Sequence, residues 1–237
     1  MTTGKLLLTS SGITNDSIHK ALVDLLGKPI NESSALFVPL AIYAYPQGIA
    51  HMWEVVKGWG DLGWKSLGLL ELTALSSLPE EIWRPQLEAT DAIIVGGGNK
   101  FYLSYWMEKS GLFGMLPQLL EQGKVYVGAS AGSLMMTSGL NFDQNRLQET
   151  SVYFDDQFNE EMSSSAGSAR TLGLVEFGIR PHLNADYFPQ AKLENVEKWA
   201  LKTGKPLYAL DDQSALKIVD GKVEVISNGE WKLFVNS

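Results

Sequence analysis

The pattern of apolar and polar residues alternates between short continuous apolar runs and longer stretches with helical periodicity. Residues 5–10 form an apolar run that predicts a buried strand. Residues 17–26 repeat apolar positions at the i, i+3, i+4, i+7 spacing of an amphipathic helix, which Gly27 is suited to end. Further strands are predicted at residues 35–42, 64–70, 92–95 and 125–129. Helices are predicted at residues 49–56, within 101–121 and directly after Ser130.

Strands that alternate with helices at this spacing predict an α/β fold with a doubly wound, mostly parallel sheet flanked by helices. The C-terminal part differs, because turn-forming Asp220-Gly221 and Asn228-Gly229 separate its apolar runs at 215–219, 223–227 and 231–235. These runs predict an antiparallel β-meander against the sheet edge. With 237 residues, the chain is expected to form a single domain, 1–237.

Charge and cysteine content narrow the class of protein. The net charge is −8 and no basic stripe is present, which argues against nucleic acid binding. The absence of cysteine excludes disulfides, thiolate metal sites and a cysteine nucleophile, and it fits a reducing compartment. The N-terminal apolar run is too short for a secretory signal or a membrane span. We therefore expect a cytoplasmic protein without membrane association.

One segment, residues 141–171, fits the alternation less well. It is polar, contains three consecutive serines at 163–165 and carries the acidic pair Asp155 and Asp156. Its length is unusual for a simple connection between elements. We expect an excursion near the active site or a lid.

The sequence Gly128-Ala129-Ser130-Ala131-Gly132 is a complete G-x-S-x-G motif between a predicted strand and a predicted helix. Small residues on both sides let the backbone turn tightly, so that the serine hydroxyl projects from the strand end. The N–H groups of the following helix can stabilise an oxyanion. The motif predicts Ser130 as a nucleophile, and the alternative is a merely tight strand-to-helix connection.

A serine nucleophile needs a base, and the chain has three histidines. His19 and His51 lie beside the apolar stripes of two predicted helices. His182 follows Arg180-Pro181 in a loop expected after a strand, where active-site groups of α/β sheets tend to lie. His182 is therefore the predicted base, and a loop histidine with local hydrogen bonds is the alternative.

The histidine also needs an acidic partner, and two acidic pairs compete for this role. Asp211 and Asp212 follow an apolar run at the end of a predicted strand, where they could instead form a turn. Asp155 and Asp156 would give the Ser, Asp, His order of α/β-hydrolases. Asp212 is preferred, but the residues alone leave the choice open.

A second glycine cluster, Gly96-Gly97-Gly98-Asn99, follows another predicted strand. It does not match the G-x-G-x-x-G pattern of dinucleotide-binding folds. Glycines allow close backbone approach, and the N–H groups of this cluster would complete an oxyanion hole with Ala131. The alternative is a plain turn after a strand.

Together, the G-G-G-N turn, the G-x-S-A-G motif, the Pro181-His182 pair and an acidic residue before the C-terminal meander resemble the peptidase E family. This family includes α-aspartyl dipeptidase and, more distantly, cyanophycinase, and its fold is related to class I glutamine amidotransferases. The resemblance extends from Leu6 to Asp212. It implies that Ser130 is the nucleophile, His182 the general base and Asp212 the third member, at a position where aspartyl dipeptidases carry a glutamate.

The resemblance also implies that Gly98 and Ala131 supply the oxyanion N–H groups and that Gly97 and Asn99 bind substrate. Family members that cut after an N-terminal aspartate carry an arginine shortly after the P-H motif, suited to a bidentate carboxylate contact. No arginine follows Arg180 in this chain. We therefore expect a weaker preference for aspartate, or a different one.

These observations predict a serine exopeptidase that hydrolyses short peptides through a Ser-His-Asp triad and an acyl-enzyme. No metal and no organic cofactor are required. The expected partner is a small peptide substrate, and a homodimer stays an open alternative. Two other functions compete with this one: an esterase or amidase with the same triad, and a non-catalytic, amidotransferase-like binding domain.

Overall fold

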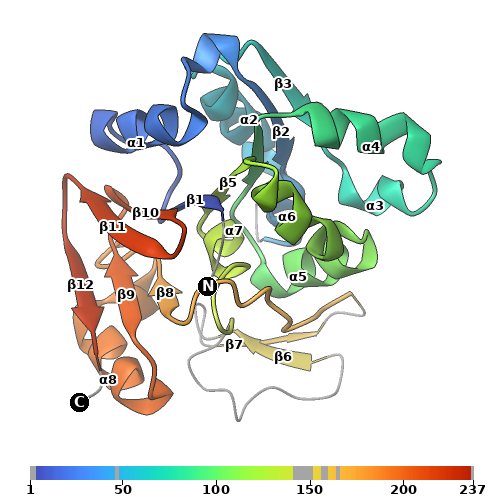
Figure 1. The fold of residues 1–237 in the computed structure, drawn as a ribbon. Coiled ribbons are helices and arrows are strands. Elements are labelled where there is room, and N and C mark those ends of the chain that lie inside the picture. The colour runs from blue at the N-terminus through green and yellow to red at the C-terminus, as the bar shows by residue number, and fades with distance from the viewer. Residues whose placement is uncertain (1–3, 46–47, 141–151, 156–159, 164–165, 236–237) are drawn as a thin grey trace.

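The fold is described from a computed structural model that places residues 4–45, 48–140, 152–155, 160–163 and 166–235. Five strands of its main sheet are parallel: β1 (Lys5–Thr9), β2 (Ser34–Val38), β3 (Ser66–Leu69), β4 (Ala92–Val95) and β5 (Val125–Ala129). Two antiparallel strands, β10 (Ser214–Val219) and β11 (Lys222–Ser227), extend the sheet beside β1. The strand order is β11-β10-β1-β5-β4-β2-β3 (Figure 1), which confirms the predicted α/β fold.

Helices cover both faces of this sheet (Figure 1). One face carries α1 (Asp16–Leu26) and α2 (Met52–Gly60). The other carries α3 (Leu72–Leu75), α4 (Glu80–Ala89), α5 (Lys100–Lys109), α6 (Leu112–Glu121) and α7 (Ala131–Leu134). Short 3-10 helices lie in the connections: η1 (Ile30–Glu32), η2 (Leu40–Ala44), η3 (Gly48–His51) and η5 (Pro189–Ala191).

Burial on both faces explains the continuous apolar runs of the central strands. Successive side chains of a strand point to opposite faces, so Leu6 and Leu8 join the core beneath α5 and α6 while Leu7 joins the core beneath α1. Helix α1 begins after Asn15, whose side chain accepts the N–H of Ile18 at 3.0 Å, and it ends at Gly27 in the left-handed conformation.

A second, smaller sheet has the order β12-β9-β8. Its strands are β8 (Gly178–Arg180), β9 (Leu207–Leu210) and β12 (Trp231–Phe234), and α8 (Leu193–Thr203) packs against them. β8 and β9 are parallel, and β12 is antiparallel to β9. Because β8 and β9 run in the same direction, the residues that follow them emerge at the same edge of this sheet.

Two predicted strands differ from the observed ones. The strand predicted at residues 35–42 ends at Val38, because Pro39 has no N–H for a strand ladder and the chain continues as η2. The third strand of the expected meander, β12, pairs with β9 instead of β11. Asp211 explains this pairing, because it forms two hydrogen bonds with Glu230, directly before β12. The Asp211 N–H donates to the Glu230 carbonyl at 3.0 Å, and the Glu230 N–H donates to the Asp211 carboxylate at 2.5 Å.

The segment at residues 141–171, predicted to be an excursion or a lid, lies largely outside the described residues. Within it, the described strands β6 (Val152–Asp155) and β7 (Glu160–Ser163) pair in antiparallel fashion. In the part of the chain that the structure describes, no helix combines the length and the apolarity that crossing a membrane requires.

Candidate active site

Ser130 lies between β5 and α7 in a strained backbone conformation, with φ 49° and ψ −112°. A non-glycine residue in such a region costs about 1–3 kcal/mol, and such strain is concentrated at functional sites. The flanking glycines are required by close contacts. A Cβ on Gly128 would lie 2.6 Å from the backbone nitrogen of Ser133, and one on Gly132 would lie 2.0 Å from the carbonyl oxygen of Val95. The turn therefore has the tight geometry that the motif predicts.

Several buried hydrogen bonds hold this turn in place. The Ser130 N–H donates to the Thr9 carbonyl at 3.1 Å, and the Ser133 hydroxyl donates to the same oxygen at 2.7 Å. The fully buried Tyr126 hydroxyl donates to the Gly132 carbonyl at 2.7 Å. Contacts to both β1 and β5 thus support the strained conformation and direct the Ser130 hydroxyl away from the core.

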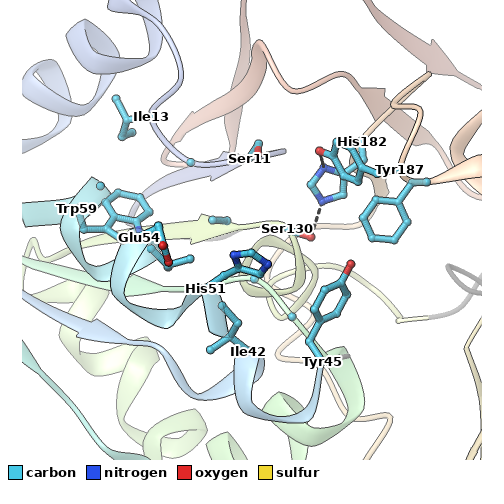
Figure 2. Close-up of a pocket in the computed structure, with 18 of the residues that line it drawn as sticks. Ser11, Ile13, Ile42, Tyr45, His51, Glu54, Trp59, Ser130, His182 and Tyr187 are labelled. Carbon is cyan, nitrogen blue, oxygen red and sulfur yellow. Dashed lines mark hydrogen bonds between the residues drawn. The ribbon is translucent and has the colours of Figure 1, made fainter. Parts of the chain in front are cut away.

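His182 follows β8 and reaches Ser130 from the second sheet (Figure 2). Its Nε2 lies 2.8 Å from the Ser130 hydroxyl oxygen. His182 is 6% exposed, and its imidazole stacks on the ring of Phe188, with centroids 4.8 Å apart. Its backbone N–H donates to the hydroxyl of Ser10 at 2.8 Å. Phe188 therefore packs on one face of the ring and Ser10 fixes the His182 backbone, with Nε2 directed at Ser130.

Asp212 follows β9 and contacts the other ring nitrogen of His182. The distance from its Oδ1 to Nδ1 is 2.7 Å. The Ser10 hydroxyl donates to Oδ1 at 3.1 Å, and the Tyr187 hydroxyl donates to Oδ2. Burial alone would raise the pKa of Asp212, but the hydrogen bond and charge of His182 and the bonds from Tyr187 and Ser10 hold that pKa below its usual value. An ionised carboxylate at this place favours the tautomer that leaves Nε2 free to accept a proton.

The other candidate partners of His182 are Asp211, Asp155 and Asp156, and none of them is seen beside its ring in the described part of the chain. The Asp211 carboxylate accepts from the Ser214 hydroxyl at 2.5 Å and from the backbone N–H of Gln213 at 3.0 Å, so it forms the turn between β9 and β10. Asp155 is the last residue of β6, and Asp156 lies outside the described residues. Of the aspartates whose side chains are described, Asp212 is the one bonded to His182.

The second glycine cluster lies directly beside Ser130. A Cβ on Gly97 would lie 3.1 Å from the Ser130 Cβ. Gly98 has φ +134°, and a Cβ there would lie 2.3 Å from the carbonyl oxygen of Ala41, so the close approach to η2 requires glycine. Ala131 is fully buried and begins α7, where the first N–H groups of a helix have no partner inside the helix. The predicted oxyanion residues thus lie on both sides of the serine.

Asn99 has a clear structural role. Its side-chain oxygen accepts the N–H of Tyr102 at 2.9 Å and caps α5, and its own N–H donates to the Ala41 carbonyl at 2.9 Å. Asn99 is buried and is not among the described residues that line the cavity beside Ser130. Its role in substrate binding stays a prediction.

A cavity of about 650 Å³ opens beside Ser130 (Figure 2). It is bounded by the loops after β1, β2 and β4, by α2 and by the segment from His182 to Phe188. These loops follow the carboxyl ends of the parallel strands, where ligands bind in open α/β sheets. A volume of this order is typical of sites for small ligands.

Sequence patterns do not indicate three residues of this site. Tyr187 and Ser10 bond Asp212 but belong to no motif, and only their contacts across the two sheets reveal them. The sequence places His51 on the flank of a predicted helix, yet this residue lines the cavity.

We expect Tyr187→Phe to lower kcat about tenfold, because the Asp212 carboxylate loses a charge-assisted hydrogen bond that holds it toward His182. Burial, with the hydrogen bond to Asp212 and the charge of that residue, raises the pKa of Tyr187, so the hydroxyl stays a donor at neutral pH. Steady-state kinetics on a dipeptide would measure the effect, with Tyr43→Phe, an exposed tyrosine of η2, as control. A change in KM alone would contradict this positioning role.

Comparisons with known proteins show which proteins this chain is similar to. The model of a family described as Peptidase family S51 matches residues 6–226. A probable alpha-aspartyl dipeptidase of Drosophila melanogaster is 25% identical over 239 residues, which cover 97% of this chain and 88% of the relative. Peptidase E of Shewanella denitrificans is 24% identical over 241 residues, and the match covers 99% of this chain and 92% of that relative. The crystal structure of a peptidase from an acI-B1 Actinobacterium shares the fold, with a TM-score of 0.69 and 17% identity. That match covers 98% of this chain and 91% of the other.

Proposed function

The chain belongs to peptidase family S51 and is a serine-type peptidase, and on that premise we propose that it is an exopeptidase that hydrolyses short peptides through a triad of Ser130, His182 and Asp212. The observation that carries the proposal is the position of the His182 ring. One nitrogen lies 2.8 Å from the serine oxygen and the other 2.7 Å from the carboxylate. This is the relation of nucleophile, base and orienting acid that acyl transfer requires.

The first half of the reaction forms an acyl-enzyme. The Ser130 oxygen attacks the carbonyl carbon of the peptide while its proton passes to Nε2 of His182, and Asp212 stabilises the imidazolium that results. The N–H groups of Gly98 and Ala131 stabilise the oxyanion of the tetrahedral intermediate. His182 then gives its proton to the leaving amine nitrogen as the C–N bond breaks.

The second half of the reaction releases the acyl group. Water takes the place of the departed amine, and His182 accepts one of its protons as the water oxygen attacks the ester carbon. The same oxyanion donors act again. When the intermediate collapses, the C–Oγ bond breaks and His182 returns the proton to Ser130, which restores the enzyme. In each half the histidine accepts and then returns one proton.

The size of the cavity supports a short substrate. About 650 Å³ accommodates a dipeptide or a little more, with Gly97 leaving room for the backbone of the substrate next to Ser130. The names of the relatives, peptidase E and alpha-aspartyl dipeptidase, also support short peptides. The second name also points to an aspartyl preference, but the cavity offers no cation for an aspartate side chain, because no lysine or arginine is among the described residues that line it.

A hydrolysis panel tests the proposed function. We expect unblocked dipeptides to be cleaved with kcat/KM at least about tenfold above their N-acetylated forms and above longer peptides, since a cavity of about 650 Å³ holds little more than a dipeptide. Liquid chromatography of the released amino acids measures the rates. Rapid cleavage of nitrophenyl esters without cleavage of any peptide would favour an esterase instead.

A further inference from the structure

The cavity beside Ser130 continues to a wall formed by α2 and its surroundings. In Figure 2, Trp59 and Glu54 lie on the opposite side of the cavity from His182 and Tyr187. The residues of this wall are mostly apolar. We call them the α2 subsite: Ile13, Glu54, Val55, Trp59 and Leu62.

Glu54 gives the α2 subsite a negative charge. Among the described residues that line the cavity, it is the only aspartate, glutamate, lysine or arginine. Neither a hydrogen bond nor an ion pair joins its carboxylate to any other residue whose position is described. A carboxylate beside apolar surface attracts cations and repels anions, and this effect grows when a bound substrate displaces water. The ligand that complements the subsite is therefore a cation.

Trp59 gives the subsite a rigid aromatic surface. Trp59 is 7% exposed, and its ring packs against Phe37, with centroids 5.9 Å apart. On another side it is bounded by Gly12, where a Cβ would lie 3.6 Å from the indole Cζ2. Ammonium and guanidinium groups bind favourably over indole rings, and the methylene stems of lysine and arginine lie well on apolar side chains.

We propose that the residue on the acyl side of the scissile bond carries a basic side chain, lysine or arginine, which the α2 subsite recognises. The stem lies along Val55 and Trp59, and the cation meets Glu54. The inference rests on the proposed function, because it requires the substrate carbonyl to lie at Ser130. An acidic side chain in the same place is repelled by Glu54.

Three dipeptides with the same second residue test this proposal: Lys-Ala, norleucine-Ala and Glu-Ala. All three carry the N-terminal ammonium, and lysine and norleucine share a similar stem but differ in charge. We expect kcat/KM for Lys-Ala to exceed that for norleucine-Ala by about tenfold and that for Glu-Ala by more. Glu54→Gln should remove the preference for lysine over norleucine, and Glu54→Lys should shift the preference toward Glu-Ala.

Glu81→Gln, an exposed glutamate of α4, serves as the matched control and should keep the wild-type preference. If Glu54→Gln lowers kcat/KM equally for Lys-Ala and norleucine-Ala, Glu54 binds the N-terminal ammonium, and the inference is overturned while the proposed function stands. Equal wild-type kcat/KM for Lys-Ala and norleucine-Ala would likewise overturn the inference and leave the proposed function intact. If no peptide is hydrolysed in a manner that depends on Ser130, the proposed function fails and the inference fails with it.

Discussion

Replacement of Ser130 by alanine is expected to lower kcat for peptide hydrolysis by about five to six orders of magnitude. Alanine removes the attacking oxygen, so no acyl-enzyme can form, and the residual rate comes from water and the oxyanion donors. The fold should be little affected. Alanine is no more strained than serine at φ 49°, and the backbone N–H of this residue still bonds the Thr9 carbonyl. Initial rates with Lys-Ala or another cleaved dipeptide, at high enzyme concentration, measure the loss.

Two further observations make the Ser130→Ala result specific. Ser76→Ala removes an exposed hydroxyl beyond the end of α3 and should keep the wild-type rate. A fluorophosphonate probe should label the wild-type protein on Ser130 and leave Ser130→Ala unlabelled. If Ser130→Ala keeps more than about a hundredth of the wild-type rate, another group performs the attack and the proposed triad is wrong.

Asp212→Asn is expected to lower kcat by about four orders of magnitude in a protein that still folds. The amide nitrogen of asparagine can donate to Nδ1 of His182, which favours the tautomer with its proton on Nε2 and blocks proton transfer from Ser130. The imidazolium also loses the charge 2.7 Å away that stabilises it. Kinetics on the same dipeptide, with circular dichroism to verify the fold, measure the effect.

Asp211→Asn provides the matched contrast, because the Asp211 carboxylate bonds the turn after β9 and not His182. It accepts hydrogen bonds from the Ser214 hydroxyl and the Glu230 N–H, both at 2.5 Å. Its replacement should lower the free energy of unfolding by about 1–3 kcal/mol and leave kcat within a few-fold of wild type. Urea unfolding measures the stability. A loss of kcat in Asp211→Asn equal to that in Asp212→Asn would mean that the turn as a whole, and not Asp212, supports catalysis.

The pH dependence of stability tests the role of Asp212 further. The pKa of Asp212 lies below its usual value of 3.8 in the folded protein. Its ionised form therefore stabilises the fold fully above that value, and the contribution is lost as the pH falls through the lower, folded pKa. In Asp212→Asn, the free energy of unfolding should therefore fall less than in the wild type as the pH is lowered through this range.

Much of the main sheet follows from local patterns. The apolar runs at 92–95 and 125–129 coincide with the observed strands β4 and β5, because a strand buried on both faces is apolar along its length. The amphipathic stripe of α1 and its terminal Gly27 define that helix almost to the residue. Local signals suffice here, because the burial of each element depends mainly on its own periodicity.

Pairings between distant segments do not follow in this way. The turn at Asn228-Gly229 favours a hairpin, but β12 joins β9, since the carboxylate and backbone of Asp211 bond Glu230. Tyr187 shows the same limit within the site. Nothing in its neighbourhood along the chain indicates that its hydroxyl meets a carboxylate 25 positions away. Such contacts depend on how two sheets lie against each other.

The sequence by itself therefore determined the order of most elements and the tight turn at Ser130, because glycine spacing and apolar periodicity are local properties. It also predicted His182 as the base, which stays a prediction. Only the tertiary structure decided between Asp212 and Asp211 as the residue beside His182, added Tyr187 and Ser10 around that carboxylate, and placed Glu54 in the cavity. The physical reason is that a hydrogen bond depends on distances of about 3 Å between atoms, and the chain alone does not specify such distances between separate sheets.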